Sequence, residues 1–195
     1  NCRHGRSQSR VQDDSGSRGQ NQRARARQVA DSLDNSVRFC CSNSFRGCSC
    51  IWAIHLRYPL PKPSITARYA ATANRVTPHR GLDFGARTGA WITAPATGTI
   101  VLNKWSDVLG WCLVLRFWHE GKNRPMYLGF AHLKKKSKHK VGTKIWEGNK
   151  WFAAVGNTGS ASRGSHLHLT YGDTPTHIFY GKTFDPEKLL ERYAK

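Results

Sequence analysis

Two histidines separated by one leucine, His166 and His168, lie in the segment GSHLHL, directly after a loop rich in glycine and serine. Side chains at positions i and i+2 of a β-strand project from the same face. An extended segment would therefore present both imidazoles together and turn Leu167 and Leu169 towards a core. A solvated face that carries two surface histidines would give the same pattern, so the pair indicates a site only if further ligands lie nearby.

A second group of potential ligands lies in the segment TPHRGLDFG, where His79 and Asp83 are close in the sequence. The preceding proline and the interrupting glycines favour a loop that runs into a strand rather than a helix. Imidazole nitrogens and carboxylate oxygens are common zinc ligands, and one histidine of the HxH pair would supply a third. Three protein ligands leave one coordination position open, as in catalytic zinc sites.

The remaining histidines and the cysteines give weaker signals. His132 lies at the end of an expected strand, in YLGFAHLKKK, and taken alone it is interpreted as a structural or surface residue. Cys112, in GWCLVLRFW, is expected to be buried in the core. The CCSNSFRGCSC segment lacks two CxxC pairs, so we favour disulfides or unpaired thiols there over a zinc knuckle. The same structural interpretation as for His132 applies to His4, His55, His119, His139 and His177.

The elements that would position these residues are mainly strands. From about residue 65, segments rich in β-forming residues alternate with turns; strands are expected within 91–105, 110–119, 124–133, 141–156, 165–172 and 176–184. Short strands at close spacing predict an all-β antiparallel domain, a sandwich or a barrel-like fold. The final segment, DPEKLLERYAK, predicts a short helix with Asp185 as N-cap and Pro186 at the first helical position.

Composition divides the chain near the proline-rich segment 58–64. Residues 1–57 contain ten arginines, no lysine and five of the six cysteines. The polar stretch 7–28 predicts disorder in this basic segment, with a weak helix expected over 24–39 and a folded domain over 58–195. A net charge of +19 predicts a polyanionic partner: nucleic acid, an anionic membrane surface or an acidic wall polymer. No membrane span is expected, and the first ten residues lack the apolar segment of a secretion signal.

Over about residues 65–190 the motifs resemble, in order, those of the lysostaphin-type zinc metallopeptidases, which cleave peptidoglycan and have the duplicated hybrid motif fold. HRGLDF resembles the HxxxD segment of the family, FAHL the segment with a single catalytic histidine, and GNTGSASRGSHLHL the glycine-rich loop and HxH strand. APATGTIV, VGTKIWEG and FDPEKLL resemble further segments. Two features depart from the family pattern: Arg163 and Ser165 precede the HxH pair, and KKKSKHK is unusually basic. Both leave the preferred substrate open.

The resemblance implies zinc ligands at His79, Asp83 and His168, and catalytic histidines that do not bind the metal at His132 and His166. It implies a zinc metalloendopeptidase that hydrolyses peptide bonds in bacterial peptidoglycan and acts outside the cell or in the cell wall. The small size, the missing signal and the strong basicity favour a phage-type lysin or virion-associated wall hydrolase over a bacterial enzyme. Anionic wall polymers would be additional partners. Two alternatives stay open: a wall-binding or regulatory module of the same fold, and a basic nucleic-acid-binding protein. For the domain itself we do not expect nucleic-acid binding, because it carries no recognised motif for it.

Overall fold

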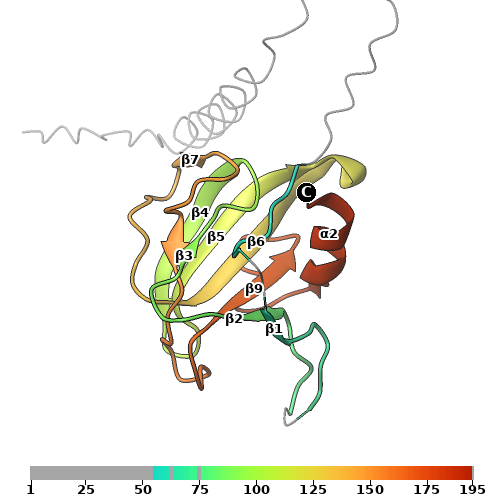
Figure 1. Ribbon diagram of the computed structural model, residues 1–195. Coiled ribbons are helices and arrows are strands. Elements are labelled where there is room, and N and C mark those ends of the chain that lie inside the picture. Colours follow the sequence, from blue (N-terminus) through green and yellow to red (C-terminus); the bar gives the residue numbers. More distant parts are fainter. Residues whose placement is uncertain (1–54, 62–63, 74–75, 195) are drawn as a thin grey trace, which may run out of the picture. The chain divides into compact units, whose positions relative to one another are not determined.

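The computed structural model describes residues 55–61, 64–73 and 76–194 (Figure 1). Three predictions fall on residues 1–54 and so lie outside the described residues: the disordered N-terminal segment, the helix at 24–39, and the state of the clustered cysteines. Among the helices that the structure describes, none is both long and apolar enough to span a bilayer.

A mainly antiparallel sheet dominates the described domain (Figure 1). Eight strands form it, in the order β1-β2-β9-β6-β5-β4-β7, with β10 paired to β9, and β3 and β8 form a separate two-stranded sheet. The strands are β1 (Ser64–Ala67), β2 (Leu82–Gly85), β3 (Trp91–Ile92), β4 (Gly98–Ser106), β5 (Gly110–His119), β6 (Arg124–Leu133), β7 (Lys144–Ile145), β8 (Ala153–Ala154), β9 (His166–Gly172) and β10 (Thr183–Phe184). A 3₁₀ turn, η1 (Glu120–Lys122), links β5 to β6, and one α-helix, α2 (Pro186–Tyr193), ends the domain.

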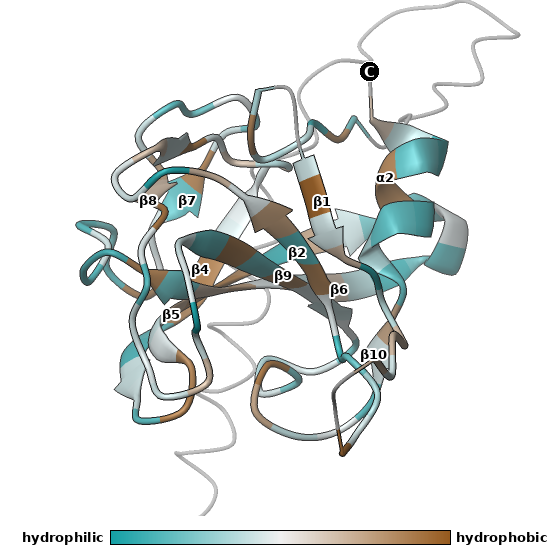
Figure 2. Ribbon diagram, turned by 60° about the horizontal axis from the view of Figure 1, so that its bottom comes forward, coloured by the Kyte–Doolittle hydropathy of each residue, from teal (hydrophilic) through white to brown (hydrophobic). Residues whose placement is uncertain are grey.

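The two faces of the large sheet are buried unequally. One face holds the main core, to which β3, β8 and α2 contribute Ile92, Ala153, Leu189 and Leu190. The other face holds a smaller apolar cluster around Cys112, Val114, Ala131 and Ile178. In Figure 2 the strands carry hydrophobic stretches, while hydrophilic residues cover much of the visible surface of α2. The alternation along β9 follows this division, because Leu167 and Leu169 belong to the main core and His166 and His168 project from the opposite face.

The predicted all-β antiparallel fold with a short C-terminal helix is confirmed. Asp185 caps α2, because its side chain accepts hydrogen bonds from the backbone N–H groups of Glu187 and Lys188. Cys112 is fully buried, as predicted.

The strand predicted over 176–184 is wrong for most of its length, because only Thr183–Phe184 are extended and paired. The preceding residues form turns that fold back over the second face of the sheet. His177 and Ile178 are buried there, and Ile178 packs in the cluster with Cys112. The β-forming composition of THIFYG thus reflects burial and not strand pairing.

The domain boundary placed at residue 58 stays a prediction, but two residues before it pack against the domain. Leu56 is buried in the main core, and its N–H donates to the carbonyl of Tyr193 at 3.2 Å. Arg57 also donates its N–H to the carbonyl of Pro95. The packed part of the domain therefore includes residues just before the proline-rich segment.

Candidate metal centre and neighbouring histidines

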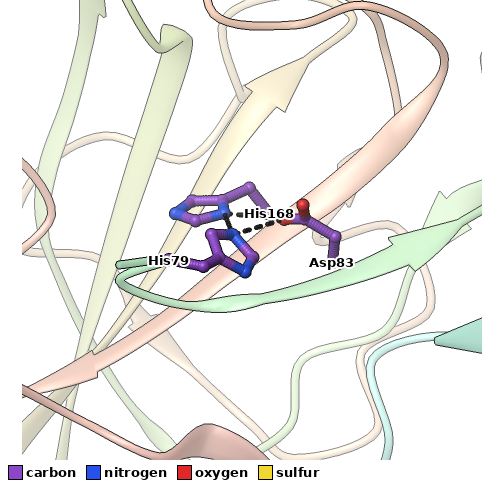
Figure 3. A group of neighbouring side chains, drawn as sticks. All are labelled: His79, Asp83 and His168. Atoms are coloured by element: carbon purple, nitrogen blue, oxygen red, sulfur yellow. Dashed lines mark hydrogen bonds and ion pairs between the residues drawn. The ribbon is translucent and has the colours of Figure 1, made fainter. Parts of the chain in front are cut away.

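Neighbouring antiparallel strands bring two of the predicted zinc ligands face to face. Asp83 of β2 is the direct pairing partner of His168 of β9. His79 lies in the loop before β2, four positions ahead of Asp83, and its ring turns back towards both (Figure 3). All three side chains are buried, and the structure gathers them as a candidate metal-binding group.

The three potential ligand atoms converge on one point. His79 Nε2 lies 3.0 Å from His168 Nδ1 and 3.1 Å from Asp83 Oδ1, and His168 Nδ1 lies 2.7 Å from Asp83 Oδ1 (Figure 3). A tetrahedral zinc ion with ordinary bond lengths separates its nitrogen and oxygen ligands by about 3.3 Å. Shifts of a few tenths of an ångström would bring this group to that spacing, so the residues fit the ion.

Hydrogen bonding sets the protonation of the three groups. His79 Nδ1 lies 2.9 Å from the carbonyl oxygen of Arg68, which can only accept, so Nδ1 carries the proton and Nε2 presents its lone pair. Burial raises the pKa of Asp83, but hydrogen bonding to His168 and the proximity of His79 outweigh burial and hold that pKa well below its usual range. Burial lowers the pKa of His168 despite its bond to Asp83. Both shifts favour the ligand forms: an ionised carboxylate and neutral imidazole.

Gly81, between His79 and Asp83, allows this close approach. A Cβ at this position would lie 2.4 Å from the carbonyl oxygen of Leu169 and 2.7 Å from Cε1 of His168. Neither distance is compatible with a side chain. The glycine of HRGLDF therefore lets the loop pass directly against the His168 ring and its strand.

A β-bulge directs His132 towards the same face. In an uninterrupted strand His132 would alternate with Ala131 and point into the main core. The pairing of β5 with β6 shifts register between Trp111 and Leu113, opposite this point, and His132 adopts a left-handed backbone with φ of 56°. The extra residue turns His132 to the site and returns Leu133 to the main core. Such backbone strain in a non-glycine residue is typical of functional positions.

The rings of His132 and His166 lie next to each other, with centroids 4.7 Å apart, and the His132 ring lies 5.9 Å from that of His168. His132 Nδ1 donates to the carbonyl oxygen of Thr158 at 2.7 Å, and His166 Nδ1 donates to that of Gly164 at 2.8 Å. Each ring therefore has Nε2 as the atom that can exchange a proton. Burial lowers the pKa of His132 to about 4, although its bond to Thr158 opposes the shift.

His166 is the most accessible of these residues, with 18% of its side chain exposed, and its Nε2 lies 3.9 Å from Asp83 Oδ1. It sits at the rim, whereas His132, His168 and His79 are enclosed. One small residue on the neighbouring strand makes room for the rings, since Ala131 pairs with His168. All five predicted site residues are thus gathered in one place.

Sequence reasoning missed the backbone groups that orient the rings. The carbonyls of Arg68, Thr158 and Gly164 accept the Nδ1 protons of three different histidines. Thr158 is further fixed by its hydroxyl, which donates to the Leu133 carbonyl and accepts from the N–H of Trp111. A backbone acceptor cannot be predicted from a pattern of side chains. The one available signal for Thr158 and Gly164 was that the glycine-rich segment GNTGSASRG directly precedes the HxH pair.

Comparison with known proteins agrees with this geometry. Residues 77–183, more than half of the chain, match the model of peptidase family M23. An uncharacterized metalloprotease of Haemophilus influenzae is 32% identical over 122 residues, which are 59% of this chain and 24% of the relative. The chain thus spans about a quarter of the length of this curated relative.

Solved structures with the same fold include two peptidases. A zinc-containing peptidase from Vibrio cholerae superimposes with a TM-score of 0.55 at 26% identity, over 68% of this chain and 39% of that protein. The catalytic domain of lysostaphin, an antimicrobial peptidase from Staphylococcus simulans, superimposes with a TM-score of 0.54 at 23% identity, over 66% of this chain and 92% of the other.

The chain belongs to peptidase family M23, a metallopeptidase family, as the match over residues 77–183 shows. The resemblance to lysostaphin-type peptidases is confirmed. The predicted zinc cofactor is confirmed as well, since the family, the zinc-containing neighbour and the His79–Asp83–His168 group agree.

Proposed function

We propose that this metallopeptidase hydrolyses peptide bonds of bacterial peptidoglycan, with zinc held by His79, Asp83 and His168. The observation that carries the proposal is the convergence of these three ligand atoms beside a second pair of histidines, His132 and His166. Zinc, when bound, supplies Lewis acidity for activating water and polarising a carbonyl group. Lysostaphin, which has the same fold, is described as an antimicrobial peptidase, and this supports a wall substrate.

His132 and His166 would move protons during the reaction. Their Nδ1 protons are held by backbone carbonyls, so Nε2 of each ring is the exchanging atom. The neutral His132 ring can accept a proton, while His166 at the rim is placed to meet the substrate. One histidine would serve as the general base and the other would donate to the oxyanion or the leaving amine. No covalent intermediate is needed.

The strongly basic composition supports a wall location for the reaction. A net charge of +19 would hold the protein on anionic wall polymers through an attraction that salt weakens. We propose that the enzyme acts outside the cell or in the cell wall; whether its source is a bacterium or a bacteriophage does not alter this chemistry. Activity on purified walls should therefore decline with rising salt.

Two substitutions separate the proposed roles. His168→Ala should lose both zinc and hydrolysis, while His132→Ala should keep zinc and lose hydrolysis. His55→Ala, which changes an exposed histidine outside the site, is the matched control and should retain both. The measurements are zinc content after dialysis and release of peptides from purified peptidoglycan, read by mass spectrometry.

Chelation should abolish the hydrolysis and added zinc should restore it. Full activity of metal-free protein would refute the proposed use of zinc. A protein that bound zinc through these residues, but released no peptide from peptidoglycans of differing cross-bridges, would refute the proposed substrate. In that case the binding or regulatory module would be the better reading.

A further inference from the structure

A second concave site lies between α2 and the sheet, apart from the histidine centre. Its volume is about 330 Å³, and its lining includes His119, Lys122, Tyr171, Phe184 and Tyr193. His119 pairs with Arg124, the first residue of β6, whereas His132 is next to the last. Arg124 and His132 therefore lie roughly 25 Å apart along β6, and so do the two sites. Tyr171 also points into the main core, away from the face that carries His168.

Two buried polar atoms belong to this lining. Tyr171 Oη and His119 Nδ1 are both buried, and within the described chain neither has a hydrogen-bond partner. Burial raises the pKa of Tyr171, so its hydroxyl stays a donor at neutral pH. Buried polar groups without partners are uncommon in folded proteins, and each calls for an explanation such as an ordered water or a bound ion.

The rim of the cavity is mainly cationic. Lys122, Lys188 and Arg192 line it, together with one carboxylate, Asp185. That carboxylate is already engaged, since Oδ1 caps α2 and Oδ2 lies 4.0 Å from Lys188 Nζ. Burial and the neighbouring Arg124 and Lys182 lower the pKa of Lys122, while Asp173 opposes them. The cavity therefore offers more positive charge than its own acids neutralise.

The floor of the same cavity is aromatic. Lys122 Nζ lies 4.1 Å from the centroid of the Phe184 ring and 5.5 Å from that of Tyr171. Tyr193 closes another side, with its ring edge-on to His119 at 5.4 Å. Binding sites for small organic molecules combine such apolar walls with a few charged groups, and their volumes start near 300 Å³. An inorganic ion alone would leave the aromatic walls unused.

We propose that this cavity binds an anionic sugar, with a phosphate or carboxylate group held by Lys122, Lys188 and Arg192 and the sugar ring packed on Phe184 and Tyr193. The Tyr171 hydroxyl, which has no partner within the described chain, would donate to the bound anion. The site is independent of the metal centre and of the peptidase reaction. Wall polymers carry both phosphate and carboxylate groups on sugars, so the proposal goes beyond the proposed substrate bond.

Calorimetric titration of the full chain tests this with four probes: glucose 6-phosphate, glucuronate, glucose and inorganic phosphate. We expect one or both anionic sugars to bind more tightly than glucose and inorganic phosphate, and their order identifies the preferred anion. Lys122→Ala should weaken that binding about tenfold, and Tyr171→Phe, which removes only a hydroxyl, about fivefold. Lys138→Ala removes the same charge from an exposed loop residue outside the lining and should have no effect.

Several results would overturn the assignment. Equal weakening in Lys122→Ala and Lys138→Ala would mean that net charge alone attracts the anion. If glucose bound as tightly as the anionic sugars, the anionic group would have no role in binding. If inorganic phosphate bound as tightly, the aromatic walls would have no role. The His119 ring provides a local readout, since its nitrogen NMR signals should shift on binding. Binding should persist in His168→Ala, so failure of this site and failure of the proposed peptidase function are distinguishable.

Discussion

The substitution Gly81→Ala should weaken zinc binding without changing any proposed ligand. Its Cβ would lie 2.4 Å from the Leu169 carbonyl oxygen and 2.7 Å from His168 Cε1, whereas ordinary contacts begin at 3.4 Å. The oxygen belongs to a backbone fixed in the β2–β9 ladder, where Leu82 pairs with Leu169. The strain must therefore be relieved by moving the loop with His79 or the ring of His168, and either movement separates two ligands.

Perturbations of the groups that orient metal ligands typically cost roughly 10- to 100-fold in affinity, and we expect a loss in that range here. Overfilling a packed position also costs about 1–3 kcal/mol of unfolding free energy. Competition with a chromophoric zinc chelator measures the affinity, and urea unfolding of the metal-free protein measures the stability. The two measurements together separate a displaced ligand from a protein that has simply unfolded.

Gly164→Ala is the matched control, because a Cβ at Gly164 meets nothing within 4 Å. Gly164 lies in the loop before the HxH pair, and the substitution leaves its carbonyl, which accepts the Nδ1–H of His166, in place. Zinc affinity in this variant should equal that of the unaltered protein. If Gly81→Ala folded and bound zinc as tightly as its control, the idea that this glycine sets the ligand spacing would be refuted.

Three further outcomes follow from burial and hydrogen bonding. Burial raises the pKa of Cys112 to about 12, so this thiol should stay unmodified by iodoacetamide at pH 8 in folded protein, as peptide mapping would reveal. Burial lowers the pKa of His177, so the unfolded chain binds more protons than the folded chain below about pH 6.5. The unfolding free energy should therefore decrease as the pH is lowered through this range, and the decrease should be smaller in His177→Gln. Thr158→Val removes a hydroxyl that fixes the loop beside His132, so peptidase turnover should fall while zinc affinity, measured by chelator competition, is retained.

The strand that carries the HxH pair was predictable because its information is local. Alternation alone places Leu167 and Leu169 on one face and His166 and His168 on the other, and the structure has this arrangement. The N-cap of α2 is local in the same way, since Asp185 and Pro186 are adjacent. The contact between Asp83 and His168 is not local, because it depends on the register of β2 against β9. Residue types suggested that one histidine of the HxH pair joins His79 and Asp83, and only the resemblance to a known family indicated that this histidine is His168.

The orientation of His132 lies beyond local pattern altogether. Read as a regular strand, FAHL sends Phe130 and His132 to the core and leaves Leu133 on the site face. A single left-handed residue, His132 with φ of 56°, reverses this order. Histidine adopts this region more often than most residues but does not require it, and the segment has no glycine that would indicate it. The bulge persists because it buries Leu133 in the main core and lets the His132 N–H reach the Leu109 carbonyl.

The proposed division of labour among the histidines follows from which atom of each ring is already engaged. In three of the rings Nδ1 donates to a backbone carbonyl; these are His79, His132 and His166. In His168 the Nδ1 atom instead faces Asp83. Three rings therefore direct an Nε2 lone pair into the site, whereas the Nδ1–H of His168 donates to Asp83 and would release its proton when zinc binds. The residues of the motif supply the nitrogens, but loop carbonyls decide which nitrogen is offered. A substitution that moves one of these loops should therefore impair the site as effectively as the loss of a histidine.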